Sequence, residues 1–339
     1  MCVEVASENT QLADDLHAER LTADAAVKRV RLSITSAAGP LAYHVISMIA
    51  ARQVFGSAVK IDLNLCDVDT SVSSAVAMDV VDLSSGSVHQ PPSVTSDPNQ
   101  FFTGADIILL LDDVTMDEGE SRADWLRRVY SKFSSYAHQI EAVCRRDVVV
   151  IVPAINSAAN FIGSVISRCA PDIPAENIVV TSRLVENRAR AEISRRTGVN
   201  SGSIVDLIVW GDASAMKPGR FAVDVSRAKV YDCESSAVWG PQYYRSVDSV
   251  VADTQWLCHD LPAATSSSSS GGAPLMSTAS ALTSFLSDWW TGNCASQRLH
   301  SAAVRSQGHV IISSAKCCNP KTKIVIFVIV IIKTLHYIF

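Results

Sequence analysis

The sequence predicts an α/β protein built on a doubly wound parallel sheet, and two observations carry this prediction. First, short runs rich in Val, Ile and Leu alternate with helix-like stretches from Arg29 to about residue 180. Runs without polar alternation, such as Ile107–Leu111 and Val148–Val152, are typical of strands covered on both faces of a parallel sheet. Second, the chain has 339 residues, of which 48% are hydrophobic and only 19% charged, so it has the material for a large core and for two domains.

The first part of the chain is expected to follow a βαβαβ order with right-handed crossovers. The expected strands are Val30–Thr35, Ile61–Cys66, Ile107–Leu111, Val148–Val152 and Ile178–Thr181, and the expected helices are Pro40–Gln53, Ser121–Cys144 and Asn156–Cys169. After Thr181 the rhythm changes. There we expect a helix at Arg183–Thr197, a strand at Ile204–Trp210, and helices at Asp248–His259 and Met276–Trp290.

These patterns divide the chain into four parts. Residues 1–28 form an N-terminal extension, 29–180 the doubly wound domain, 181–293 a second domain and 294–339 an apolar tail. The tail contains nine consecutive apolar residues at Ile324–Ile332. A membrane span needs about 20 such residues, so a terminal strand or a poorly packed extension is favoured over a span.

Composition and charge exclude several classes of partner and place the chain in the cytoplasm. The net charge of −5 provides no basic surface for nucleic acid. The nine cysteines form no CxxC pair, which favours reduced thiols of an intracellular protein over a metal or disulfide framework. The first 28 residues have no apolar signal-peptide core and carry several acidic residues, unlike a mitochondrial presequence. We therefore expect a cytoplasmic protein that does not associate with membranes.

A candidate nucleotide loop follows the first predicted strand. The segment Thr35-Ser36-Ala37-Ala38-Gly39-Pro40-Leu41-Ala42 lies between that strand and a helix, where backbone N–H groups cradle a pyrophosphate in dinucleotide-binding folds. The second strand ends at Asp67, whose carboxylate would accept hydrogen bonds from the adenosine ribose. The alternative is that Asp67 merely ends a strand.

Several blocks of residues resemble the cytosolic malate dehydrogenase family. They are Ile34–Gly39 followed by Ala42-Tyr43, then Ala170–Asn177, Ser182-Arg183-Leu184, Asn187-Arg188-Ala189 and Val209-Trp210-Gly211. The block Ser236-Ala237-Val238-Trp239-Gly240-Pro241 is similar to the divergent branch called malate dehydrogenase type 1B. The resemblance runs from about Val30 to Asn293. It implies a Rossmann domain, a lactate/malate dehydrogenase-like α+β C-terminal domain that is incomplete here, NAD as cofactor, a dicarboxylate substrate and a homodimer.

The resemblance assigns the cofactor loop to Ser36, Gly39 and Ala42, with Asp67 as the ribose ligand. Ser36 stands where the family has its first loop glycine, so its Cβ costs energy in the tight turn. Pro40 removes one N–H group that could face a phosphate. At the end of the third expected strand, where relatives have a glycine, this chain has Asp112, which would crowd and repel the pyrophosphate. We therefore expect weak NAD binding.

At the catalytic end, the family's Asp–His dyad falls on Val185 and Ala213, so both members are missing. The spacing between these two positions needs no gap against the family. A missing general base alone lowers a rate by about 10²–10⁴-fold. Glu186 is the nearest carboxylate in sequence, but one helical step turns its side chain by about 100°, away from the site.

Three residues remain as candidate substrate ligands by the resemblance: Arg122, Asn160 and Arg188. The other arginine position of the family's mobile loop falls on Met116-Asp117, which puts an acid where the substrate is an anion. Each candidate also has a structural interpretation. Arg188 could pair with Glu192, Arg122 could be a solvated charge, and Asn160 could cap its helix.

Two functions follow from these residues. The favoured one is a malate dehydrogenase-like pseudoenzyme that keeps the fold and acts as a binding, sensing or scaffold protein. The alternative is a working NAD-dependent malate dehydrogenase that uses groups not recognised here. A tail-anchored membrane protein is a third, minor hypothesis.

Overall fold

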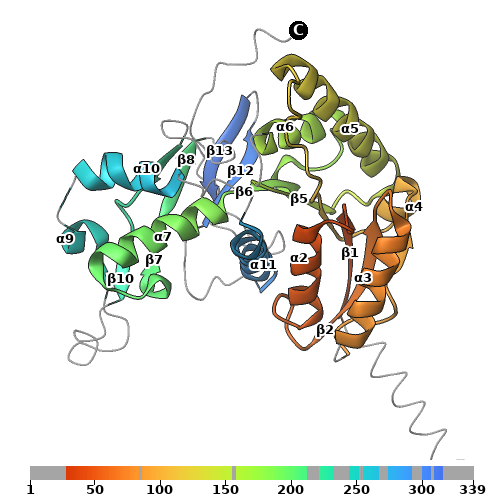
Figure 1. Ribbon diagram of the computed structural model, residues 1–339, viewed down its shortest axis with the longest axis horizontal. Coiled ribbons are helices and arrows are strands. Elements are labelled where there is room, and N and C mark those ends of the chain that lie inside the picture. Colours follow the sequence, from red (N-terminus) through yellow and green to blue (C-terminus); the bar gives the residue numbers. More distant parts are fainter. Residues whose placement is uncertain are drawn as a thin grey trace, which may run out of the picture.

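In the computed structural model, an eight-stranded sheet forms the centre of the protein (Figure 1). The structure describes residues 28–83, 86–154, 158–211, 221–231, 244–251, 253, 255–266, 274–291, 300–306 and 309–315. Six strands are parallel and lie in the order β3-β2-β1-β4-β5-β6. This is the order of a doubly wound dinucleotide-binding sheet, so the predicted fold class is confirmed.

All five expected strands are present in this domain, and the structure adds a strand at Ser93–Thr95 and helices at Thr70–Leu83 and Pro98–Phe102 that the sequence pattern did not predict. The strands are β1 (Lys28–Thr35), β2 (Val59–Cys66), β3 (Ser93–Thr95), β4 (Ile107–Leu109), β5 (Val149–Pro153) and β6 (Ile178–Thr181). The helices are α2 (Pro40–Ala50), α3 (Thr70–Leu83), α4 (Pro98–Phe102), α5 (Arg122–Val143) and α6 (Ala159–Cys169), with a 3₁₀ turn η1 (Ala175–Asn177) before β6.

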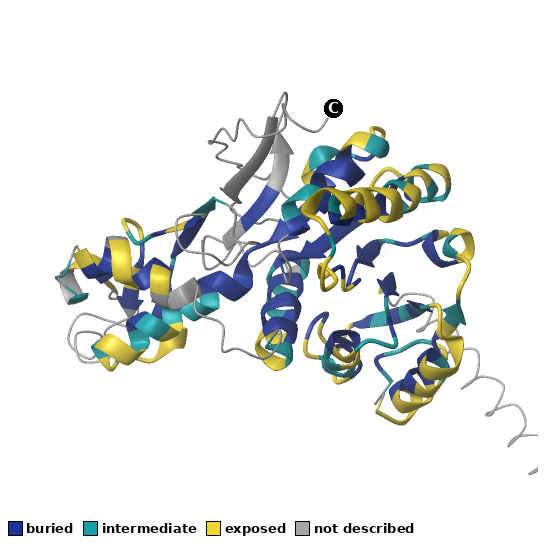
Figure 2. Cartoon of the chain, turned by 45° about the horizontal axis from the view of Figure 1, so that its top comes forward, coloured by how far each residue is buried: buried dark blue, intermediate teal, exposed yellow. Residues whose placement is uncertain are grey.

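Both faces of the sheet are buried, which explains the apolar sequences of β4, β5 and β6. Ile107 and Leu109 of β4 pack in one cluster with residues of α2 and α3. Ile108, between them, packs in a second cluster with residues of α5 and α6. Figure 2 shows buried strands between helices whose outer faces are exposed. Alternate side chains of β4 therefore enter different cores.

The second part of the chain contains a mixture of helices and short antiparallel strands. The helices are α7 (Arg183–Thr197), α9 (Val247–Val251), α10 (Leu261–Ser266) and α11 (Leu275–Thr291), with a 3₁₀ turn η2 (Ser201–Ser203) and a π-helical turn η4 (Trp256–Asp260). The strands are β7 (Ile204–Val205), β8 (Ile208–Gly211), β9 (Phe221–Asp224), β10 (Lys229–Tyr231) and β11 (Tyr244–Ser246). Helix α11 packs against both α2 and α7 and so joins this part to the doubly wound domain.

Two predicted elements of this region differ from the structure. The strand expected at Ile204–Trp210 is divided into β7 and β8, because Asp206 has a left-handed φ of 58° that breaks the extended backbone. The helix expected at Asp248–His259 is also divided, into α9 and the π-helical turn η4. Short polar interruptions of this kind do not change the spacing of the apolar residues, so the sequence pattern predicts one continuous element in each case.

Part of the expected tail joins the central sheet. Strands β12 (His300–Ser306) and β13 (His309–Ala315) form an antiparallel hairpin, and β12 pairs with β6 through Ala302 and Ala303. The apolar run Ile324–Ile332 lies outside the described residues. Among the helices that the structure describes, none is both long and apolar enough to cross a bilayer.

Candidate functional site

The carboxyl ends of β1, β2 and β4 meet at the point where the strand order reverses. In doubly wound sheets, ligands bind in the crevice outside these strand ends. Ser36, Asp67 and Asp112 each come shortly after one of the three strands. Because β1 pairs with both β2 and β4, the fold brings these residues to one edge of the sheet. The candidate site is therefore built around this edge.

The loop after β1 makes the tight turn expected of a nucleotide loop. Ser36 has φ 49°, a left-handed conformation that favours glycine. The Gly39 N–H donates to the Ser36 carbonyl at 2.9 Å, and a Cβ on Gly39 would lie 3.0 Å from that same oxygen. Ala42 is buried in the first turn of α2. The chain thus keeps a glycine at the end of the turn, Gly39, and has Ser36 in the strained left-handed conformation at its start.

Asp67 lies close enough to this loop to serve the ribose role. Its Oδ2 accepts from the Ala38 N–H at 2.9 Å and its Oδ1 from the Asp69 N–H at 3.2 Å. A carboxylate offers about four acceptor positions, so two remain for hydroxyl groups. The side chain is fixed toward the loop and half-buried, which fits the adenosine end of a dinucleotide.

The phosphate part of the loop offers fewer donors than the turn alone suggests. The Ala37 N–H donates to the Cys66 carbonyl at 3.1 Å, and the N–H groups of Ala38 and Gly39 have the partners described above. Pro40, at the first position of α2, has no N–H. Donors for a phosphate therefore come from the next residues of the helix, whose N–H groups lack intrahelical acceptors. The residues fit a dinucleotide at its ribose and would hold its phosphates with a reduced set of donors.

Asp112 is a buried carboxylate with a complete set of partners. It is 3% exposed. Its Oδ2 accepts from the Thr35 hydroxyl at 2.5 Å, and its Oδ1 accepts from the hydroxyls of Ser36 and Tyr136, both at 3.2 Å. The Lys132 ammonium lies 2.6 Å from the same Oδ1. From the sequence, Asp112 was expected to be an unpaired charge that faces the cofactor. The structure instead pairs it with Lys132 of α5.

The other titratable groups beside Asp112 stay protonated. Burial, and then the negative charge of Asp112, raises the pKa of the Cys66 thiol to about 11. Burial and the same carboxylate also raise the pKa of Tyr136 well above its ordinary value. Neither group is therefore suited to act as a base near neutral pH.

Sequence reasoning missed Lys132 and Tyr136, although their spacing held a signal. Together with Arg128, they repeat every four residues along one side of α5. Three long polar side chains in one row on an amphipathic helix indicate a shared polar environment. No pattern in the sequence connects this row with the loop almost a hundred residues earlier.

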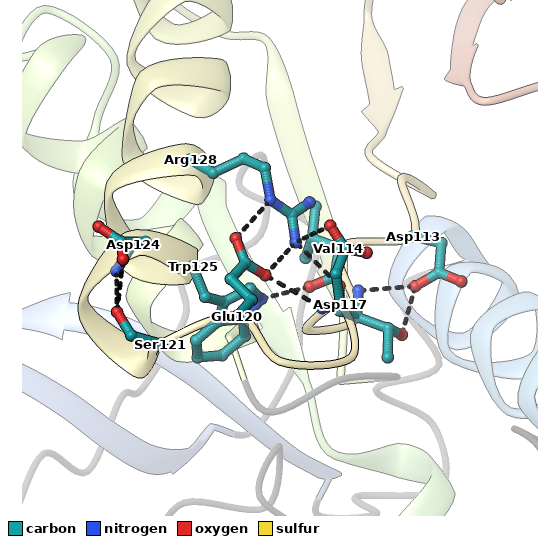
Figure 3. A network of polar contacts seen from close by, with 9 residues as sticks. Asp113, Val114, Asp117, Glu120, Ser121, Asp124, Trp125 and Arg128 are labelled. Carbon is teal, nitrogen blue, oxygen red and sulfur yellow. Dashed lines mark hydrogen bonds and ion pairs between the residues drawn. The ribbon is translucent and has the colours of Figure 1, made fainter.

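The loop between β4 and α5, residues 110–121, is attached to α5 at several points (Figure 3). Arg128 donates to both carboxylate oxygens of Glu120, at 2.9 and 2.7 Å. The Trp125 indole N–H donates to the Val114 carbonyl at 2.6 Å. Asp117, the acid at the family's arginine position, lies 3.4 Å from Arg128. The corresponding loop is mobile in the family, but here charged and aromatic groups of the helix hold it.

The three candidate substrate ligands follow the ends of consecutive parallel strands. Arg122 begins α5 after β4, Asn160 lies in the first turn of α6 after β5, and Arg188 lies in α7 after β6. The topology thus brings all three to the same edge of the sheet. Arg122 is exposed, whereas the other two are half-buried. Desolvation lowers the pKa of the Arg188 guanidinium.

Two of the structural interpretations given above can be compared with the contacts in the structure. The N-cap of α6 is Ala158, so Asn160 is not the cap of its helix. Glu192, which was considered as a partner of Arg188, forms an ion pair with Arg195 at 2.7 Å.

The position of the family's dyad carboxylate is apolar. Val185 is 1% exposed and packs in one cluster with Leu207 and Val209. Its neighbour Glu186 is fully buried and forms an ion pair with Arg190 at 2.7 Å. Ala213, the other dyad position, lies outside the described residues.

The fold and the loop define a dinucleotide-binding domain of the dehydrogenase type, and comparison with known proteins identifies the family. Residues 30–178 match the description "lactate/malate dehydrogenase, NAD binding domain". The chain is 31% identical to "Putative malate dehydrogenase 1B" of Branchiostoma floridae over 91% of this chain and 59% of that protein. It is 30% identical to the protein of the same name in Bos taurus over 75% of this chain and 52% of that protein. The chain belongs to the lactate/malate dehydrogenase family.

The chain spans about half the length of these two curated relatives. Solved structures show the same fold. Malate dehydrogenase from Naegleria fowleri superposes with a TM-score of 0.74 at 22% identity, covering 89% of this chain and 90% of that one. Lactate dehydrogenase from Trichomonas vaginalis, in complex with NADH and oxamate, has a TM-score of 0.72 at 19% identity, covering 91% of this chain and 92% of that one.

Proposed function

We propose that this protein binds NAD but is catalytically impaired as a malate dehydrogenase, and that it acts as a binding or scaffold protein. The observation that carries this proposal is the apolar burial of Val185 at the dyad position. Without a carboxylate there, nothing at that position fixes the tautomer and orientation of a catalytic histidine. The chain also has Ala213 where the family has that histidine.

The cofactor proposal assigns roles to four residues. Asp67 would accept from the ribose hydroxyls, while Ser36, Gly39 and Ala42 shape the turn under the pyrophosphate. A bound nicotinamide dinucleotide would supply the hydride chemistry of the family. The complex of a Trichomonas vaginalis relative with NADH supports this choice of cofactor. We expect weak binding, because the first loop residues offer few free N–H groups.

The substrate side would keep a partial set of anion ligands. Arg188 and Asn160, with Arg122 at the start of α5, would hold one carboxylate of a small dicarboxylate. Asp117 places a negative charge on the loop where the family has a cation, and it lies near Arg128 instead of being free to close over a substrate. A ligand would therefore be bound at one end and left without a proton acceptor.

The proposal is tested by titrating the purified full chain with NADH and then measuring oxaloacetate turnover. Turnover is expected at least ~10³-fold below that of an active relative, because members of a catalytic dyad act as a unit. Turnover within tenfold of the relative would instead establish the alternative, a working malate dehydrogenase with a base not recognised here.

We also propose a homodimer in the cytoplasm. Helix α3 of the doubly wound domain carries exposed apolar residues, including Val72, Met78 and Val81. Such residues support an association surface.

The described cysteines Cys66, Cys144 and Cys169 are free thiols, in keeping with a reducing compartment. Sedimentation equilibrium of the purified chain and fractionation of cells that express it check the two statements.

A further inference from the structure

We propose that Lys132 determines the affinity of the nucleotide loop for anions by offsetting the charge of Asp112. This inference rests on the proposed cofactor function, since it concerns the same loop. It adds a residue from α5 to a site that otherwise consists of strand ends and the loop after β1. Asp112, the acid of this pair, stands where the family has a glycine.

Geometry places the lysine beside the loop. One oxygen of Asp112, Oδ1, is 2.6 Å from the Lys132 ammonium and 3.2 Å from the Ser36 hydroxyl. A single carboxylate oxygen therefore separates the ammonium from the first residue of the turn. The Lys132 side chain is 40% exposed, whereas Asp112 is buried. The positive member of the pair is therefore partly exposed to solvent, whereas the negative member is buried.

The network surrounds Asp112 with donors. The hydroxyl groups of Thr35, Ser36 and Tyr136 and the ammonium of Lys132 all contact its carboxylate oxygens. An ionised carboxylate beneath the loop would repel a pyrophosphate, and the repulsion is strong where water is excluded. With the ammonium in place, the pair is neutral. An ammonium has three donors, so Lys132 can bond to Asp112 and still direct an N–H toward a ligand.

The other charge close to the loop does not replace this cation. Asp67 is negative and is held by the Ala38 N–H. The Cys66 thiol remains neutral near pH 7 because burial raises its pKa. Removing the lysine charge would therefore leave two carboxylates beside a pyrophosphate.

Four proteins test the proposal: the wild type, Lys132→Met, Asp112→Asn and the double variant. The affinity for NADH is measured by calorimetry, and binding of inorganic pyrophosphate by the shift in thermal unfolding. Lys132→Met is expected to weaken both ligands roughly tenfold, a change typical of one uncompensated charge at a partly buried site. Asp112→Asn should tighten both ligands, and the double variant should return to within about threefold of the wild type.

Lys60→Met serves as the matched control. Lys60 lies near the start of β2, at the opposite edge of the sheet, and bonds to the Gly86 carbonyl. The substitution Lys60→Met removes the same charge as Lys132→Met and should leave the affinities for NADH and pyrophosphate within about twofold of the wild type. If Lys132→Met lowers the unfolding temperature without ligand, Lys132→Gln, which keeps a donor for Asp112, replaces it in the series.

The outcomes separate this proposal from the cofactor proposal. If Lys132→Met behaves like Lys60→Met, or if the double variant is as weak as Lys132→Met, the charge-offset role is wrong. If the ranking holds for pyrophosphate while the wild type does not bind NADH, the role of Lys132 stands and the cofactor proposal fails. If the wild type binds neither ligand, both are wrong.

Discussion

Ser36 takes a strained backbone conformation at the start of the nucleotide loop. Its φ of 49° is a conformation in which an L side chain costs about 1–2 kcal/mol, but its hydroxyl donates to Asp112 and recovers part of that cost. Ser36→Val should lower the free energy of unfolding by roughly 2 kcal/mol, because a β-branched residue is strained there and makes no hydrogen bond. Ser36→Gly should remain within about 0.5 kcal/mol of the wild type, since relief of strain offsets the lost hydrogen bond. Urea denaturation measures both values, and equal stability of the two variants would contradict a left-handed turn at this position.

At the scale of elements, the loop at residues 110–121 and helix α5 are expected to behave as one unit. Arg128→Ala removes the double hydrogen bond to Glu120, which in turn accepts from the Asp117 N–H at 3.0 Å. The amide of Asp117 should then exchange with solvent at least several-fold faster. Hydrogen exchange followed by mass spectrometry measures this rate. Arg127→Ala is the matched control, because Arg127 pairs with Asp124 within the helix and does not contact the loop.

The same contact gives the loop a pH dependence. Hydrogen bonds from Arg128 lower the pKa of Glu120 below its ordinary value. A depressed carboxyl pKa contributes stability above the unfolded-state value, and this contribution is lost as the pH falls through the folded-state value. Exchange at Asp117, corrected for its intrinsic pH dependence, should therefore accelerate at acidic pH in the wild type. A loop that exchanges equally fast in wild type and Arg128→Ala at neutral pH would be free rather than attached.

Element prediction from sequence succeeded where burial imposes a period and failed where backbone geometry decides. Strand β6 and helix α7 were expected with the bounds that they have, because both faces of β6 are apolar and Gly198 ends α7 in a left-handed conformation. Helix α3 was missed, since its exposed Val72 and Met78 blur the amphipathic pattern. The division at Asp206 was missed because a positive φ leaves little trace in composition.

At the scale of the whole molecule, buried charges join α7 to α11 and through it to the doubly wound domain. Arg183 contacts Asp288 of α11 and lies 3.8 Å from Glu186, which is 2.7 Å from Arg190. Glu186→Leu leaves two largely buried guanidinium groups without this carboxylate, so it should lower the free energy of unfolding by roughly 3 kcal/mol. A more solvent-accessible pair offers a control: Glu192→Leu, which removes the ion pair with the exposed Arg195, should cost less than about 1 kcal/mol. Comparable losses in chemical denaturation would show that the buried cluster does not join the two parts.

The candidate site could be assembled from sequence only in part. Loop, strand end and Asp67 follow one another in an order that the doubly wound fold fixes, so their meeting was predictable. The environment of Asp112 was not, because its partner Lys132 comes from a helix whose rotation about its axis depends on tertiary packing. Helix spacing alone predicts that Glu186 can pair with Arg183 and Arg190 of the same helix, whereas the contact of Arg183 with Asp288 of α11 depends on tertiary packing.

Restoring the family's catalytic groups is the most direct measure of how far this molecule has departed from an enzyme. Val185→Asp places a carboxylate in an apolar cluster, so alone it should destabilise the protein by several kcal/mol and add no activity. Ala213→His alone should recover little, because no carboxylate fixes the imidazole tautomer. The two changes together with Asp117→Arg, which replaces the acid on the loop by a cation, should raise oxaloacetate reduction by more than the single changes combined. Initial rates with NADH, normalised to folded protein, measure the effect; a purely additive result would show that residues 185 and 213 do not meet as a dyad in this chain.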